Sequence, residues 1–295
     1  MPVDVAVVLL VSGLVGFVSG LVGVGGGFIM TPSLIFLGVP APVAVATGAS
    51  QIAATSFSGI MSQSRRKSVD WRMGLLLSIG GVLGDVFGVA LFHRLQALGQ
   101  LDLVIQLLYV VFLAIVGALM LAESIAVIRG RSAPAKNILA RPARTIAHRL
   151  PFRLRFPRSG LYISVIPPLL LGFCVGVLAI IMGVGGAFIL VPAMIYLLRM
   201  PTNVVLGTSL FQVLIVSGLA VVLQATENQK VDLVLAAVLM LGGVVGAQYG
   251  ARVGARLRSE QIRAVLALIL LASSAVFLIG LVWEPSELFT LTGGP

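Results

Sequence analysis

The fold is decided by a glycine-rich stretch at residues 23–32, which reads GVGGGFIMTP. A second stretch at residues 183–192 reads GVGGAFILVP and matches the first at seven of ten positions. Glycine relaxes the limits on the backbone, whereas proline removes an N–H and interrupts a helix. Because both stretches lie between long apolar runs, they predict matching helix breaks in two membrane-embedded halves, a pattern that points to a transporter's binding site.

The similarity between the two halves extends beyond these stretches, in the same order and with an offset that drifts only from 160 to 162 residues. Residues 40–51 align with residues 201–212, and both segments contain the pattern T-x-x-x-Q. Later matches pair Val69-Asp70 with Val231-Asp232, Gly80 with Gly242, Gly81 with Gly243, Gly84 with Gly246, and Gly88 with Gly250. We therefore interpret the chain as two copies of one unit.

Composition favours an all-α, polytopic helical membrane protein. Of the 295 residues, 59% are hydrophobic and only 10% are charged, with a mean hydropathy of +1.11; a soluble domain has about 25% charged residues. The formal charge of +10 is explained by basic residues that flank apolar spans, so no nucleic-acid partner is expected. A single cysteine and two distant histidines exclude an internal disulfide and argue against a metal site. No cofactor is expected.

We expect five apolar segments in each half. A full span needs about 20 residues, and the second segment of each half has only about a dozen, so it is short or half-inserted. The expected segments are 3–22, 27–38, 43–62, 72–93 and 101–128, then 162–182, 187–198, 203–224, 231–254 and 262–282.

The placement of charge favours ten crossings. If every segment crosses, 18 of the 20 Lys and Arg residues fall on one side, which should be cytoplasmic, and both termini are periplasmic. An odd number of crossings per half makes the two repeats inverted. If the short segments re-enter instead, the split falls to 14 against 6, with eight full spans and parallel halves. This alternative stays open.

The expected domains are a first transmembrane repeat at 1–128, a basic cytoplasmic linker at 129–160, a second repeat at 161–284 and a short tail at 285–295. The linker holds nine Lys or Arg and no acid, which suits a loop that sets topology. Its segment 152–156 alternates apolar and basic residues and could rest on anionic lipid, at about 1 kcal/mol per basic residue.

Polar groups at membrane depth are the candidates for substrate binding. Helix N-termini and N–H groups freed by the glycine stretches attract anions, and Thr31-Pro32 fits a helix start. The third segment of each half adds hydroxyls and amides, which either bond between helices or donate to an oxyanion. The candidate residues are Gly23, Gly25, Gly26, Gly27, Pro32, Thr47, Ser50, Gln51, Gly183, Gly185, Gly186, Pro192, Asn203, Thr208, Ser209 and Gln212.

Asp85 is the one acid well inside a predicted span, and Ala247 stands at the equivalent position of the second half. An Asp at the centre of a span costs about 2.5–3.5 kcal/mol on insertion scales. Asp85 is therefore a candidate for taking up a proton and coupling transport to the proton gradient. The alternative is a protonated or hydrogen-bonded packing residue.

The doubled GVGG(G/A)FI motif, its trailing proline and the T-x-x-x-Q pattern resemble the TauE/SafE sulfite exporter family over about residues 5–282. The resemblance implies an inner-membrane permease for sulfur-containing anions such as sulfite, sulfoacetate, other organosulfonates and thiosulfate. Asp85 is not expected from the family pattern. The site that the resemblance implies comprises Gly23, Gly25, Gly26, Pro32, Gly183, Gly185, Gly186 and Pro192, with the polar positions of the third segments.

The sequence therefore predicts a secondary transporter of a small anion that works by alternating access between two repeats. No Walker motif is present, so ATP is not the direct energy source. One alternative is a passive anion channel. Another is a membrane-embedded enzyme, although no HExxH or GxSxG motif is present and we do not expect an enzyme.

Overall fold

The computed structural model describes residues 5–22, 26–65, 68–99, 101–128, 153–183, 185–198, 200–226, 232–254 and 259–283. These residues form ten α-helices and one β-hairpin, which confirms the predicted helical architecture. The first half contains α1 (Val5–Val22), α2 (Gly27–Phe36), α3 (Ala41–Arg65), α4 (Trp71–Ala97) and α5 (Leu101–Ile128). The hairpin strands β1 (Arg153–Phe156) and β2 (Leu161–Ser164) precede α8 (Ile166–Met182), α9 (Ala187–Tyr196), α10 (Thr202–Thr226), α11 (Leu233–Gly254) and α12 (Ser259–Trp283).

Four helices in the described part of the chain are long and apolar enough to cross a membrane, namely Trp71–Ala97, Leu103–Ala122, Val204–Thr226 and Leu233–Val253. Shorter apolar helices cover Val5–Leu21, Ile166–Met182 and Ala267–Val276. Large apolar side chains such as Leu83, Phe87 and Leu241 are more than half exposed. Exposed apolar surface on this scale is typical of a face that contacts lipid.

The two helices that follow the glycine stretches are short, as predicted. Each has ten residues, so each is about 15 Å long, half the thickness of a membrane core. The predicted helix start at Thr31-Pro32 is wrong, because α2 already begins at Gly27 and both residues lie inside it. The reason is Gly26, which adopts φ 72° and accepts N–H bonds at 3.2 Å from Ile29 and Met30, so that the first turn forms earlier.

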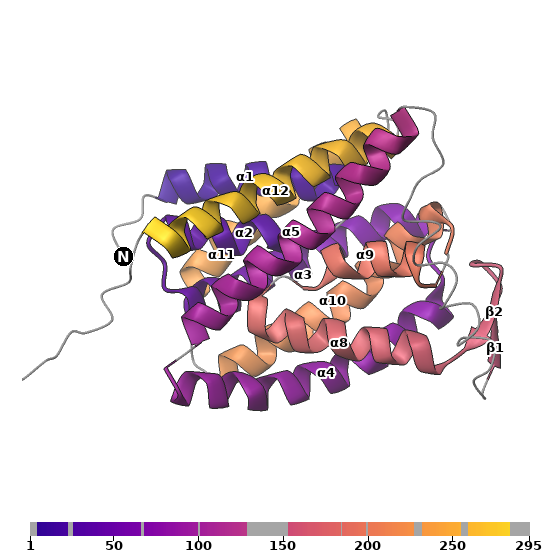
Figure 1. Cartoon of the computed structure of the whole chain (residues 1–295), viewed down its shortest axis with the longest axis horizontal. Helices are drawn as coiled ribbons and strands as arrows, with labels where there is room; N and C mark the ends of the chain where they lie inside the picture. Colours follow the sequence, from indigo (N-terminus) through magenta and orange to yellow (C-terminus); the bar gives the residue numbers. More distant parts are fainter. Residues whose placement is uncertain are drawn as a thin grey trace, which may run out of the picture.

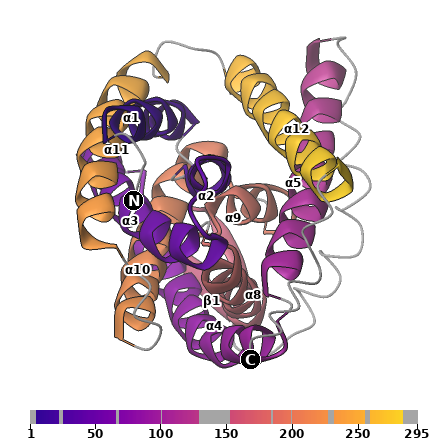
Figure 2. The same cartoon turned by 90° about the vertical axis from the view of Figure 1, so that its left-hand side faces the viewer.

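The helices pack in reciprocal pairs that link the two halves. The most extensive contacts join α1 to α11 and α4 to α8, followed by α5 with α12 and α3 with α10. Figure 1 shows α8 beside α4, and Figure 2 shows α1 beside α11 and α5 beside α12, with α2 and α9 between these pairs. Exchanging each helix for its counterpart in the other half turns the pair α1–α11 into α8–α4. This reciprocity supports the predicted repeat.

Glycines allow the closest of these contacts. A Cβ added at Gly80 or Gly84 would come within 3.0 Å of the α8 backbone, and one added at Gly246 or Gly250 would clash with the α1 backbone. Small residues four apart therefore bring helix backbones together, as is common in membranes. The same spacing in both halves explains why the two pairs resemble each other.

The hairpin extends across the predicted boundary at residue 160 between linker and second repeat. Its strands pair antiparallel, with Arg155 opposite Tyr162, and Phe156 is buried. The alternation at 152–156 that suggested lipid contact also has the period of a strand. In Figure 1 the hairpin lies at the end of the molecule where α8 begins. Residues 129–152 lie outside the described chain.

Candidate functional site

The second glycine stretch forms a buried helix break. α8 ends at Met182, and Gly183, Gly185 and Gly186 all have φ between 66° and 69°, a conformation that side chains with a Cβ rarely adopt. A Cβ at Gly185 would also lie 2.7 Å from Ser217 Oγ. This position therefore requires glycine for both conformation and space.

The first glycine stretch is described only in part, because Gly23 and Gly25 lie outside the described residues. Gly26 precedes α2 in the left-handed conformation, and Gly27 begins the helix. A Cβ at Gly26 would lie 2.7 Å from Ser19 Cβ. Pro32 lies inside α2, as Pro192 lies inside α9.

Side chains from three other helices brace the break at the end of α8. The Tyr109 hydroxyl donates to Met182 O at 2.7 Å, Thr31 Oγ1 donates to Gly183 O at 3.3 Å, and Gln224 Nε2 donates to Ile180 O at 3.4 Å. The last carbonyls of a helix lack partners within the helix. Elements of both halves, α2, α5 and α10, therefore hold this break in place.

Sequence reasoning missed these bracing residues. Tyr109 and Gln224 are isolated polar groups in apolar segments, and that isolation was the available signal. Thr31 was assigned to a helix start instead.

Three predicted site residues use their hydroxyl groups in hydrogen bonds within the protein. Thr47 Oγ1 accepts the N–H of Asp232 at 3.3 Å, and Thr208 Oγ1 accepts the N–H of Asp70 at 3.0 Å. These two bonds are equivalent in the two halves and fix the starts of α11 and α4. Ser209 Oγ donates to Leu206 O within its own helix. Substrate contact by these hydroxyls stays a prediction, and the side chain of Asn203 lies outside the described part.

Gln51 and Gln212 lie near the middle of α3 and α10, two 25-residue helices that pack together. Gln51 Nε2 donates to Ser12 O at 3.2 Å, and its side chain lies against Gly243. Gln212 Nε2 lies 3.0 Å from where a Cβ of Gly81 would stand. The amides thus contact different helices, at equivalent glycines, and their convergence on one anion stays a prediction.

Several buried polar atoms in the described chain have no hydrogen-bond partner. They are Ser50 Oγ, Gln51 Oε1, Ser56 Oγ, Ser78 Oγ, both Asp85 oxygens, both Gln212 amide atoms and Ser217 Oγ. Most buried polar groups are paired, and each unpaired one costs about 1–3 kcal/mol. Some of these atoms lie near the middle of two membrane helices, and one lies beside the break at Gly185. Their positions favour a binding region for a polar ligand.

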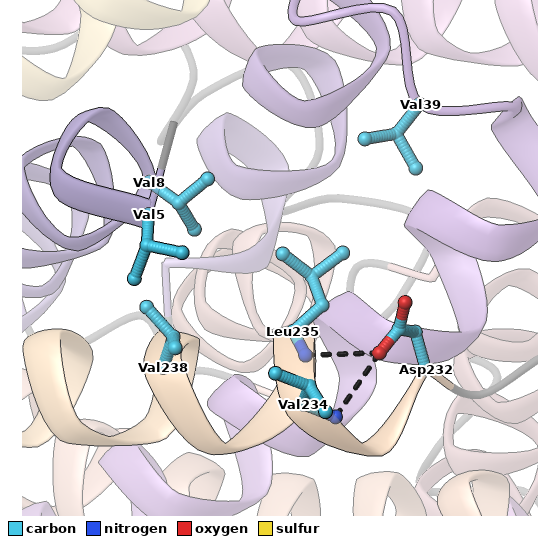
Figure 3. A pocket seen from close by; sticks show the side chains of 7 residues that line it. All are labelled: Val5, Val8, Val39, Asp232, Val234, Leu235 and Val238. Carbon is cyan, nitrogen blue, oxygen red and sulfur yellow. Dashed lines mark hydrogen bonds between the residues drawn. The ribbon is translucent and has the colours of Figure 1, made fainter. Parts of the chain in front are cut away.

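A pocket of about 290 Å³ lies at the end of the molecule where α11 begins (Figure 3). Asp232 Oδ1 accepts the N–H groups of Val234 and Leu235 at 3.0 Å each, and Figure 3 shows the other oxygen directed into the pocket. Because a carboxylate repels anions, this pocket is poorly suited to bind an anion. Its lining residues are Val5, Val8, Val39, Asp232, Val234, Leu235 and Val238.

Similar proteins carry the names of membrane transporters. A "Probable membrane transporter protein" of Xylella fastidiosa is 29% identical over 276 residues, covering 92% of this chain and 94% of the relative. The "Probable membrane transporter protein YjnA" of Bacillus subtilis is 27% identical over 272 residues, covering 90% and 96%. No solved structure gives a significant match. The fold and these relatives define a multi-pass membrane transporter.

The family model described as "Sulfite exporter TauE/SafE" matches residues 8–277, nearly the whole chain. The chain belongs to the TauE/SafE sulfite exporter family, which confirms the resemblance seen in the doubled glycine motif. Among the described residues, no group of three His, Cys, Asp or Glu side chains lies close enough together to hold a metal ion.

Proposed function

We propose that this protein is a secondary transporter that moves a small anion, a sulfur oxyanion or organosulfonate, by alternating access between its two halves. The observation that carries the proposal is the buried helix break at Gly183–Gly186, which lies beside unpartnered polar groups and is braced by both halves. The family's description as a sulfite exporter supports the choice of substrate class.

The donors near the break suit an anion that must also leave. The N-terminus of α9, the amide of Gln212 and the hydroxyl of Ser217 are neutral donors, and helix N-termini attract negative charge. Residues 27–60, 166–198 and 202–226 contain no Lys or Arg that would hold an anion too tightly. A site of this kind favours rapid exchange over tight binding.

The reciprocal packing of the halves supports two equivalent repeats around a shared axis, and the 18-to-2 split of Lys and Arg favours the inverted arrangement. In this proposal both termini are periplasmic, the linker is cytoplasmic and can contact anionic lipid, and the protein lies in a bacterial-type inner membrane. Asp85, fully buried within α4, is the candidate for proton coupling.

Uptake into proteoliposomes tests the proposal. Purified protein is reconstituted, a pH gradient is imposed, and uptake of labelled sulfite, sulfoacetate, thiosulfate and taurine is compared with that of protein-free liposomes. We expect at least one sulfur anion to accumulate above equilibrium when the gradient is present. Flux that only equilibrates would indicate a passive channel, and no protein-dependent flux of any of the four compounds would refute the proposal.

A further inference from the structure

One face of α4 carries polar side chains on both sides of a glycine. Ser78, Gly81 and Asp85 are three and four residues apart, so they lie on the same face, with Cβ positions one turn apart separated by about 5–6 Å. Gly81 leaves space that Gln212 of α10 occupies, with Nε2 3.0 Å from the Cβ position. Ser78 and Asp85 therefore flank the Gln212 amide along the axis of α4.

None of the polar atoms in this group has a hydrogen-bond partner. Ser78 Oγ, both oxygens of Asp85 and both amide atoms of Gln212 are unpartnered, and the three side chains are 3%, 0% and 0% exposed. These side chains can donate and accept hydrogen bonds, and none of the atoms named above is bonded within the described protein. Such an arrangement is expected where a proton or a bound ligand completes the network.

The equivalent position in the other half lacks this group. Met240 stands in place of Ser78 and Ala247 in place of Asp85. Gln51, the counterpart of Gln212, has its Nε2 bonded to Ser12 O at 3.2 Å. The two glutamines share a place in the repeat, so the chain itself supplies a control in which the amide is present without the acid.

We propose that Asp85, Gln212 and Ser78 form the coupling-proton site of the transporter, and that the Gln212 amide relays the protonation of Asp85 to the anion. When Asp85 takes a proton from water, its O–H donates to Gln212 Oε1, which leaves Nε2 free to donate to the anion. When Asp85 is ionised, its carboxylate accepts from Nε2, which withdraws that donor from the anion. The proton leaves to water on the other side of the membrane. This inference rests on the function proposed above.

Other titratable groups do not compete for this role in the described structure. The neighbouring helices α8 and α10 contain no Asp, Glu, His, Lys or Arg, and Cys174 of α8 is exposed. On α5, the Tyr109 hydroxyl donates to Met182 O, and the side chains of Asp102 and Glu123 are not described. The charged or titratable side chains of α4 besides Asp85 are exposed ones at its two ends, Arg72, His93 and Arg94.

The first test measures how thiosulfate binding to the purified full-length protein depends on pH. Thiosulfate is chosen because it stays ionised near neutral pH. We expect the wild-type Kd to weaken by up to about tenfold per pH unit once Asp85 ionises, which is the slope for one coupled proton. Gln212→Ala and Asp85→Asn should both lose this slope, and Asp85→Asn should keep the affinity of the protonated protein. Gln51→Ala should weaken binding and keep the slope.

A second readout needs no anion. The infrared band of the protonated Asp85 carboxyl, assigned by its absence in Asp85→Asn, should shift in Gln212→Ala and stay in place in Gln51→Ala. A wild-type slope in Gln212→Ala, an unmoved band, or a slope lost equally in Gln51→Ala would overturn the relay. Binding that follows sodium rather than pH would also overturn it.

The two readouts separate failure of the relay from failure of the proposed function. If no sulfur anion binds or is transported and the band still shifts in Gln212→Ala, the proposed function fails while the pairing of Asp85 with Gln212 stands. If an anion is transported without a pH slope and the band does not move, the relay fails while the transporter stands.

Discussion

Asp70 and Asp232 occupy equivalent places at the starts of α4 and α11. Among the described residues, however, only the Asp70 side chain is hydrogen-bonded by another segment of the chain. Asp70 Oδ1 accepts from Met73 N at 3.2 Å, as an N-cap does, and Oδ2 accepts from Ser159 N at 3.1 Å and Ser159 Oγ at 2.6 Å. Arg158 adds a bond from Nη1 to Val69 O at 2.7 Å. The hairpin therefore clamps this end.

The Asp232 end shares the common parts of this arrangement, and no described segment bonds to the Asp232 side chain as the hairpin bonds to Asp70. Asp232 caps its own helix, and its N–H is held by Thr47 as that of Asp70 is held by Thr208. Where the hairpin would lie, this end has the 290 Å³ pocket. The caps and threonines are thus common to both halves, whereas among the described residues the hairpin contacts the Asp70 end alone.

Gly185→Val has the largest expected effect, because the helix break lies between these two ends and is braced by both halves. The side chain would be strained at φ 66° and would meet Ser217 and Ile52. We expect proteoliposome transport to be abolished while membrane insertion is retained. Gly218→Val is the matched control, since a Cβ there meets nothing within 4 Å. Equal loss of transport in both variants would contradict this role.

Asp70→Asn should destabilise the protein more than Asp232→Asn does. Asparagine caps a helix about as well as aspartate, so both helices keep their N-cap. Asp232→Asn should therefore lower the free energy of unfolding by about 0.5 kcal/mol or less. At residue 70 the amide NH₂ cannot accept from Ser159, and the loss of charged hydrogen bonds should cost about 2–4 kcal/mol. Unfolding by denaturant titration in detergent micelles measures the difference. Equal costs would show that the clamp contributes nothing.

Ser159→Ala sharpens the same comparison from the hairpin side. It removes the 2.6 Å bond to Asp70 and keeps the backbone N–H bond, so the free energy of unfolding should fall by about 1–2 kcal/mol. In an Asp70→Asn background the same change should cost much less, because the Ser159 hydroxyl stabilises the protein through its bond to Asp70. Additive costs in this double-mutant cycle would mean that Ser159 stabilises the hairpin by another route.

Thr47→Val and Thr208→Val should have smaller effects than Asp70→Asn and Ser159→Ala, and these should be similar to each other. Each removes one neutral hydrogen bond to a backbone N–H, which costs about 1 kcal/mol. The same unfolding titration measures both. A large difference between the two variants would break the equivalence of the ends on which the comparison rests.

The sequence predicted the helices well and their partners poorly. The apolar runs stop at glycine, proline and charged residues, so segments such as 27–38 and 101–128 match the observed 27–36 and 101–128 closely. Helix pairing was not predictable, because in a membrane the outward face is as apolar as the buried one and periodicity does not mark the contact. Glycines at four-residue spacing indicated contact faces without identifying the partner.

For the candidate site, the sequence indicated which polar groups are buried and gave little about their arrangement. Gln212 and Asp85 were singled out as polar groups at membrane depth, and both are buried without partners. Gln212 lies against Gly81, one turn of α4 from Asp85, and no sequence spacing reveals this contact. The hairpin was missed because four-residue strands are short, and its contact with Asp70 joins segments 89 residues apart.

The central claim is that the two equivalent ends face opposite sides of the membrane, with the clamped Asp70 end cytoplasmic. Reporter fusions test it most directly, with alkaline phosphatase or green fluorescent protein placed after residue 140 and at the C-terminus. The account predicts a fluorescent, phosphatase-inactive fusion after residue 140 and a dark, phosphatase-active fusion at the C-terminus. Fluorescence at both sites would place the C-terminus and the linker on the same side and contradict the inverted arrangement.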